Sequence, residues 1–314
     1  MSFDSLIKFG YNLLYRMKFY EARLIWYQFF NTISPLKSEE IRRKIDSAVH
    51  EKRCSTVAEK YLERLEKDEH FEHFKSPPAG EKIIWQCWFQ GEENAPEVIK
   101  KCFETVKKFC GDYKRIVLSE KNIHEYVEFP DFILKKYEKG IICKAHFSDL
   151  LRVYLLSEYG GVWLDASVYL IRPIPEDILD ADFFVFKRPK TKPNSRIIGN
   201  WFIVSKPHSI LIEMIKESLT LFWKDEHDEI DYFIMHYLFS VAVRKNSLFQ
   251  NEFEKIPFYS NRKPHRFDRL LHSKTGYSDS RLRKYHNAFF CQKLFHRHPL
   301  AGELLNRINK LNLN

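Results

Sequence analysis

Phe147-Ser148-Asp149-Leu150-Leu151-Arg152, continued by Gly160-Gly161-Val162-Trp163-Leu164-Asp165-Ala166-Ser167, predicts a helix, a tight turn and a short strand in succession. Asp149 and Arg152 are three residues apart, so they share one helix face, while the neighbouring positions are apolar. The Gly-Gly pair permits a turn that a Cβ would hinder, and the short β-rich run after it is typical of a buried strand. Asp165 then follows the strand, where open α/β sheets bind their ligands.

The rest of the chain repeats this alternation of strands and helices. Further strands are predicted at 83–89, 115–118, 183–186 and 201–204. Further helices are predicted near residue 96 and at 120–126, 131–138, 209–222 and 231–243. Such alternation predicts an α/β fold with a largely parallel sheet wrapped by helices. The polar and basic stretch 261–285 is predicted to be a loop.

The first 75 residues differ from the remainder and are predicted to be helical. A basic and aromatic helix near the start either lies on a membrane surface or packs its apolar side on the main domain. A second, highly charged helical region at 38–74 is expected to be a solvated hairpin partner. Ser76-Pro77-Pro78-Ala79-Gly80 then marks a boundary. The predicted organisation is a helical extension at 1–78 and a main domain at 79–314.

Composition narrows the class of protein. The chain has 314 residues, 44% of them hydrophobic, and a formal net charge of +9. The charge fits a phosphorylated ligand or an anionic lipid surface, and no nucleic-acid-binding signature accompanies it. Six cysteines form no C-x-x-C pair, no apolar run is long enough for a membrane span, and no signal peptide is recognised. A cytoplasmic protein, peripheral on the inner face of the membrane in one interpretation, is therefore expected.

Three other segments extend the first one into a wider pattern: Lys82 to Gly91, Asn200 to Pro207, and Ile230 to Tyr237. Together they resemble the capsular polysaccharide synthesis protein family, over roughly residues 80–280. That family is related to the glycosyltransferases that include the yeast initiating mannosyltransferase and the large clostridial glucosylating toxins. The resemblance implies a GT-A fold, Rossmann-like with a mostly parallel sheet, and a glycosyltransferase activity.

The resemblance places the centre of the site at Asp165. In similar families this strand ends in Asp-x-Asp, whose first carboxylate contacts the donor and whose second binds a divalent metal on the diphosphate. Ser167 stands at the second position here, and a hydroxyl is a weaker ligand for a hard cation than a carboxylate. Mn²⁺ or Mg²⁺ held by Asp165 with Ser167 or water is one expectation. A plain surface carboxylate at the end of a strand is the alternative.

The resemblance also suggests donor contacts elsewhere. Asp149 and Arg152 are implied to contact the donor sugar, although an ordinary ion pair within a helix explains them equally. Trp85, Gln86 and Trp88 lie at the end of the first strand, where an aromatic ring can stack on uracil. One of the two tryptophans is expected to alternate into the core.

The remaining candidates lie later in the chain. Asn200 begins the segment that resembles the sugar-facing strand. Asp231 is either an acidic residue near donor and acceptor or only a helix cap, and His236 is expected to be packed. His272 and Lys274 are implied to close a loop over the diphosphate, with alternatives at Arg262, Lys263, His265 and Arg266 or a solvated loop as the other interpretations. His296-Arg297-His298 is more typical of a surface than of a metal site.

Taken together, the resemblance implies a retaining enzyme that moves a hexose from a UDP-sugar to a growing bacterial capsular or surface polysaccharide. The catalytic candidates are Asp165, Arg152 and Asp231. The expected acceptor is a glycan or a lipid-linked oligosaccharide, with an anionic membrane surface as a further partner of the basic N-terminal helices. The alternative is a non-catalytic interaction protein of the glycan assembly machinery, suggested by the missing second Asp.

Overall fold

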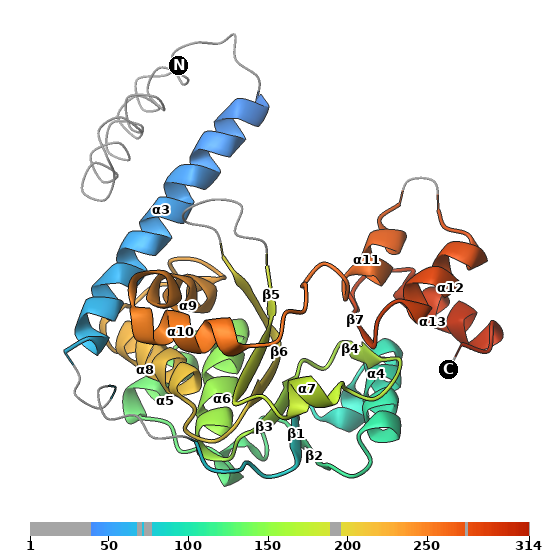
Figure 1. The fold of residues 1–314 in the computed structure, drawn as a ribbon, viewed down its shortest axis with the longest axis horizontal. Coiled ribbons are helices and arrows are strands. Elements are labelled where there is room, and N and C mark those ends of the chain that lie inside the picture. Colours follow the sequence, from blue (N-terminus) through green and yellow to red (C-terminus); the bar gives the residue numbers. More distant parts are fainter. Residues whose placement is uncertain (1–38, 68–70, 72–76, 189–195, 274–275, 314) are drawn as a thin grey trace.

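The computed structural model describes residues 39–67, 71, 77–188, 196–273 and 276–313 (Figure 1). Its α-helices are α3 (Glu39–Leu65), α4 (Glu97–Phe109), α5 (Asp131–Glu138), α6 (Lys144–Glu158), α7 (Glu176–Leu179), α8 (Ile210–Asp225), α9 (Ile234–Lys245), α10 (Ser247–Lys255), α11 (Arg266–Leu271), α12 (Asp279–Asn287) and α13 (Ala301–Lys310). Its strands are β1 (Ile83–Cys87), β2 (Lys114–Leu118), β3 (Gly161–Leu164), β4 (Val168–Leu170), β5 (Phe183–Lys187), β6 (Ile198–Ser205) and β7 (Cys291–Lys293).

A five-stranded sheet with the order β2-β1-β3-β6-β5 forms the centre of the molecule. β1 pairs in parallel with β2 and with β3, while β6 is antiparallel to both β3 and β5. Four strands therefore run in one direction and β6 runs in the other, which confirms an α/β fold with a mostly parallel sheet. The finer GT-A assignment stays a prediction.

Two groups of helices flank this sheet. Figure 1 shows α8, α9 and α10 beside β5 and β6, and α4 with the C-terminal helices on the other side of the view. The main core joins the sheet to α3, α6, α8 and α9. A second core joins α4 and the short antiparallel ribbon of β4 and β7 to α11, α12 and α13.

The predicted Gly-Gly turn leads from α6 into β3. Gly160 and Gly161 have φ angles of +68° and +93°, a region that other residues rarely adopt. A Cβ on Gly161 would lie 2.6 Å from the carbonyl oxygen of Ile83 on the neighbouring strand. Glycine is thus required here both by the backbone angle and by the close approach of β1. The predicted helix, turn and strand are all confirmed.

The helix α3 is not the solvated hairpin partner that its charge suggests. Its apolar positions recur at helical spacing and are buried against the main domain: Cys54, Ala58, Tyr61, Leu62 and Leu65. The Tyr61 hydroxyl also donates a hydrogen bond to Glu226 at 2.7 Å. The predicted basic helix near the chain start lies outside the described residues, and the boundary at residue 78 stays a prediction. Within the described part, no helix combines the length and the apolar character of a membrane span.

Two other local predictions need correction. The stretch 261–285 contains α11 and α12, because a few apolar residues among many polar ones (Phe267, Leu270, Leu271 and Leu282) meet in the second core. The predicted helix at 120–126 is only a single 3₁₀ turn, Ile123–Glu125. In both places the secondary structure depends on a few side chains that the average composition of the segment does not reveal.

Candidate active site

A cavity of about 870 Å³ opens at one edge of the sheet. The carboxyl ends of β1, β3 and β5 reach it, and so does the start of β6, because β6 runs in the opposite direction. Side chains of α4, α6 and α9 and of the C-terminal segment complete its walls. Asp165, the carboxylate that follows β3, lies in this cavity as the sequence predicts.

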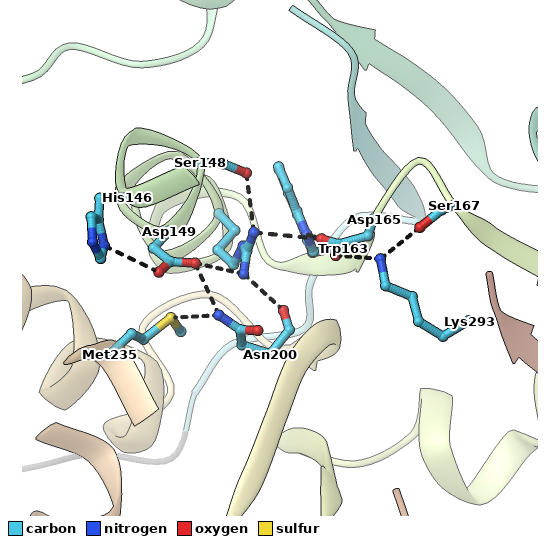
Figure 2. A network of polar contacts seen from close by, with 10 residues as sticks. His146, Ser148, Asp149, Trp163, Asp165, Ser167, Asn200, Met235 and Lys293 are labelled. Carbon is cyan, nitrogen blue, oxygen red and sulfur yellow. Dashed lines mark hydrogen bonds and ion pairs between the residues drawn. The ribbon is translucent and has the colours of Figure 1, made fainter. Parts of the chain in front are cut away.

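Both oxygens of the Asp165 carboxylate accept contacts from cationic or polar groups (Figure 2). Oδ1 accepts a hydrogen bond from the Trp163 indole at 3.0 Å and lies 3.4 Å from Nη2 of Arg152. Oδ2 accepts from Nζ of Lys293 at 2.7 Å. Burial raises the pKa of Asp165, but Lys293 and Arg152 outweigh burial and leave the pKa below its ordinary value. The carboxyl is therefore ionised at neutral pH.

Arg152 contacts Asp165 and also pairs with a second carboxylate, Asp149, which lies with Arg152 on α6. Its guanidinium lies 2.7 Å from Oδ1 of Asp149 and donates to the Asn200 carbonyl at 3.1 Å. The Asn200 side chain in turn donates to Asp149 at 2.9 Å (Figure 2). Burial raises the pKa of Asp149, while Arg152 opposes that shift. The predicted residues Asp149, Arg152, Asp165 and Asn200 are thus brought together, and the ion pair is part of the cavity wall.

Lys293 is the site residue that the sequence did not reveal. It lies in β7, where it is paired with Val168 of β4, directly after Ser167. Its ammonium donates to the Ser167 hydroxyl at 2.7 Å as well as to Asp165 (Figure 2). The two predicted metal-site residues are therefore bridged by a lysine side chain.

The structure separates the residues predicted at the end of the first strand. Trp85 is fully buried, and its indole donates to the carbonyl of Gly160 at 2.9 Å, so it belongs to the core. Gln86 is also fully buried and accepts from Arg115. Trp88 alone of these three lines the cavity. The expected alternation therefore sends Trp85 inward: it lies within β1, whose first four residues are buried, whereas Trp88 lies just beyond the end of the strand.

Asp231 does not line the cavity and lies in the turn before α9. Its Oδ1 accepts from the backbone N–H of Phe233 at 2.6 Å, just before α9 begins. Its Oδ2 lies 2.6 Å from Nε2 of His50, on α3. Asp231 is therefore held by the turn before α9 and by α3, while the N-cap residue of α9 is Phe233. One turn further, His236 is buried but lines the cavity.

The basic C-terminal stretch contributes different residues from those first expected. His272 ends α11 with its ring 2.9 Å from the carbonyl of Asp268, and it does not line the cavity. Lys274 lies outside the described residues. His265, one of the alternatives, does line the cavity, together with His296 and Arg297. Composition alone cannot show which of the basic residues in this stretch line the cavity.

Positively charged side chains outnumber carboxylates among the residues that line the cavity. Among the described residues that line it, two carry carboxylates, Asp149 and Asp165, and five carry permanent positive charges: Lys144, Arg152, Arg188, Lys293 and Arg297. Burial lowers the pKa of His265 to about 4, with Lys293 adding to the shift. The cavity therefore favours an anionic ligand.

Two groups of metal-ligand type occur elsewhere in the described residues. One combines His50, Cys54 and Asp231, and the other combines Cys143, His146 and Glu229. Neither contains Asp165 or Ser167, so neither corresponds to the metal site expected at the end of β3.

Acidification is expected to destabilise the protein through His236. Burial, together with the nearby guanidinium groups of Arg196 and Arg152, lowers the pKa of His236 to about 3. In the unfolded chain the pKa is about 6.5, so between these values only the unfolded chain binds the proton. The contribution of neutral His236 to the free energy of unfolding is therefore present above the pKa of the unfolded chain and is lost as the pH falls. This group should lower the free energy of unfolding by about 2 kcal/mol between pH values of about 7.5 and 5.

Urea unfolding at both pH values checks this expectation. A His236→Gln variant should lose about 2 kcal/mol less than the wild type over the same interval. His124→Gln is the matched control, because His124 is exposed, and its pH dependence should equal that of the wild type. An identical loss in His236→Gln and the wild type would contradict the assignment.

Comparisons with known proteins agree with the sequence pattern. A sequence model of the family described as capsular polysaccharide synthesis protein matches residues 32–303. The O-glycosyltransferase braB of Annulohypoxylon truncatum is 26% identical over 168 residues, which cover 48% of this chain and 39% of braB. The O-glycosyltransferase PaGT of Phomopsis amygdali is 26% identical, with 43% of this chain and 37% of PaGT covered. The uncharacterized glycosyltransferase L373 of Acanthamoeba polyphaga mimivirus is 28% identical, with 44% and 55% covered.

The matches therefore span about two fifths of the length of the two fungal relatives. A solved structure titled PaToxG Glycosyltransferase aligns with 78% of this chain and 99% of its own. The alignment has a TM-score of 0.39 and 13% identity. A TM-score of that size assigns no fold.

Proposed function

The chain belongs to the capsular polysaccharide synthesis protein family, and we propose that it is a glycosyltransferase that moves a hexose from a UDP-sugar to a hydroxyl group of a bacterial capsular or surface glycan. The three relatives described above are all named as glycosyltransferases, which supports the enzyme class. The observation that carries the proposal is the network of the buried Asp149 and Arg152 with the partly exposed Asp165, in a cavity lined mainly by positively charged side chains.

The cavity suits the diphosphate of a nucleotide sugar. A phosphate ester needs charge-assisted hydrogen-bond donors, and the cavity offers two lysines and three arginines. Three further atoms are buried without a hydrogen-bond partner among the described residues: Nε1 of Trp88, Nε of Arg152 and Nδ1 of His236. Buried polar groups are ordinarily satisfied, so their gathering in one cavity supports a polar ligand there.

Different walls of the cavity suit different parts of the donor. Trp88 offers a flat ring to the base. Arg152 and Asn200, held by Asp149, present donors and acceptors to the sugar hydroxyls. Lys293, next to Asp165, supplies positive charge to the phosphates. In this arrangement the nucleotide lies toward β1 and the sugar toward β6.

The chemistry proposed is a transfer with retention at the anomeric carbon, in line with the resemblance. The bond from the anomeric carbon to the diphosphate breaks, and the acceptor oxygen forms the new bond on the same face. The departing diphosphate oxygen takes the acceptor proton, and the cavity's cations stabilise the charge that develops on it. Both cavity carboxylates are occupied by Arg152 or Lys293, which fits a reaction without a separate carboxylate base.

Release of UDP by the purified protein tests the proposal. UDP-glucose, UDP-galactose and their N-acetyl forms are each incubated with the protein, and GDP-mannose serves as the donor with the wrong base. We expect UDP to be released slowly from one UDP-sugar by hydrolysis. The release should become faster when a glycan acceptor is added, because the sugar is then transferred to it. The absence of turnover of every donor, in a folded protein that also fails to bind UDP, would refute the proposal.

A further inference from the structure

The position expected for a divalent cation is occupied by a side chain of the protein. In the turn Asp165-Ala166-Ser167, Nζ of Lys293 lies 2.7 Å from Oδ2 of Asp165 and 2.7 Å from Oγ of Ser167 (Figure 2). In the similar families the second position of this turn, here Ser167, is the one that would hold the metal. Lys293 thus places one positive charge where such a metal would place two.

The lysine is held there by the backbone and not only by its own charge. β7 pairs with β4 in the register Val168 to Lys293, and the N–H of Leu294 donates to the Ser167 carbonyl at 3.0 Å. Gln292, the preceding residue, is fully buried and accepts a hydrogen bond from the N–H of Phe267. The ribbon therefore fixes Lys293 opposite the turn.

The side chains as arranged do not fit a divalent cation. Both oxygens of Asp165 already accept from positively charged or N–H groups, and the Ser167 hydroxyl is a weak ligand for a hard cation. Asp149, the other cavity carboxylate, is bound by Arg152 and Asn200. The cavity is lined by five positively charged side chains and only two carboxylates, so it also repels an added metal cation.

We propose that Lys293 replaces the divalent metal, so that this protein binds and uses its donor without Mn²⁺ or Mg²⁺. The inference rests on the proposed use of a nucleoside-diphosphate donor. Lys293 is partly exposed in the cavity, with 20% of its side chain accessible, so its ammonium can donate to a phosphate as well as to Asp165. Asp165 is then the residue that positions the lysine, and Arg188, His265 and Arg297 in the same cavity wall add donors for the diphosphate.

Calorimetric titration with UDP and UMP tests the inference without requiring turnover. UDP is titrated in EDTA and again in Mn²⁺. For the wild type we expect affinities within about twofold of each other, and donor hydrolysis that is unaffected by EDTA. Because the contact is made to phosphate, UDP should bind at least about tenfold more tightly than UMP in both solutions.

Substitution of the lysine supplies the second measurement. Lys293→Met should weaken UDP binding by about tenfold or more and bring the UDP and UMP affinities close together. Lys293→Arg should keep most of the preference for UDP. The matched control is Lys206→Met, since Lys206 also pairs with a carboxylate, Asp182 at 2.6 Å, but does not line the cavity. Its nucleotide affinities should equal those of the wild type.

A combined variant converts the turn into the metal-binding pattern. In Ser167→Asp with Lys293→Met, two carboxylates face each other without the ammonium, and Mn²⁺ should now strengthen UDP binding by about tenfold or more. Should a lysine variant fail to fold, the wild-type titrations in EDTA and Mn²⁺ decide the question alone.

The outcomes separate this inference from the proposed function. UDP binding that collapses in EDTA and returns with Mn²⁺ in the wild type would overturn the replacement of the metal, and would leave the use of a UDP donor intact. A Lys293→Met variant with an unchanged preference for UDP over UMP would also overturn it. A wild type that binds neither nucleotide in either solution and turns over no donor would remove the proposed function and the inference together.

Discussion

An Asp165→Asn variant is expected to turn over donor about a thousandfold more slowly than the wild type, while its affinity for UDP changes less than about tenfold. Asparagine keeps the shape of the side chain but removes the negative charge that Lys293 contacts at 2.7 Å and Arg152 at 3.4 Å. Both cations remain in the cavity, so UDP still finds positive charge. The ammonium of Lys293 loses the carboxylate that orients it within the cavity, so the rate is affected more than the affinity.

Initial rates of UDP release and calorimetric affinities, measured on the same preparation, check this split. Asp182→Asn is the matched control, because Asp182 also pairs with a lysine but does not line the cavity. It should behave as the wild type does. Turnover by Asp165→Asn above about a tenth of the wild-type rate would contradict the role given to Asp165.

An Arg152→Met variant is expected to lose about 3–5 kcal/mol of stability and nearly all donor turnover. The guanidinium is 5% exposed and is the charged partner of Asp149 in the interior of the domain. Its removal leaves a buried carboxylate without a counterion, which is strongly destabilising. The same change removes the donors that face the cavity beside Asp165.

The two effects of Arg152 can be separated with a double variant. Asp149→Asn added to Arg152→Met removes the unpaired charge, so much of the lost stability should return while turnover stays absent. Lys216→Met is the matched control, since Lys216 and Glu213 form another buried ion pair three residues apart on a helix. It should lose stability without losing turnover in the folded protein. Recovery of turnover in the double variant would show that Arg152 acts only through stability.

The elements that the sequence predicts well are those specified by neighbouring residues. The helix, turn and strand from 147 to 164 follow from helical spacing, from two glycines with positive φ and from a run of β-rich residues. The position of Asp165 at the end of that strand follows from the same local pattern. These features depend on interactions within about twenty residues, which a single sequence contains.

Features that depend on contacts between residues far apart in the sequence are harder to predict. Trp85 turns inward to the carbonyl of Gly160, 75 residues away, and Asp231 lies 2.6 Å from His50, 181 residues away. The helices α11 and α12 form because four apolar residues meet α4 and α13 in the second core. None of these contacts has a signature in the local sequence.

Lys293 is the clearest case of this limit. The segment Cys291-Gln292-Lys293 has no motif, and its role comes only from the register of a ribbon with three residue pairs. A shift of one residue would turn the lysine to the other face of the ribbon and leave Asp165 without its partner. The missing second Asp at Ser167 was visible in the sequence, but what compensates for it was not.

The ribbon of β4 and β7 also has a consequence for biosynthesis. Asp165 and Lys293 are 128 residues apart in the chain. At a translation rate of about 5–20 residues per second, the lysine follows the aspartate by roughly 6–25 s. During that interval β5 and β6 are added to the sheet, while Asp165 still lacks the ammonium group that contacts it. A chain in which translation stops before β7 would therefore lack the lysine to which the proposed binding of the diphosphate is assigned.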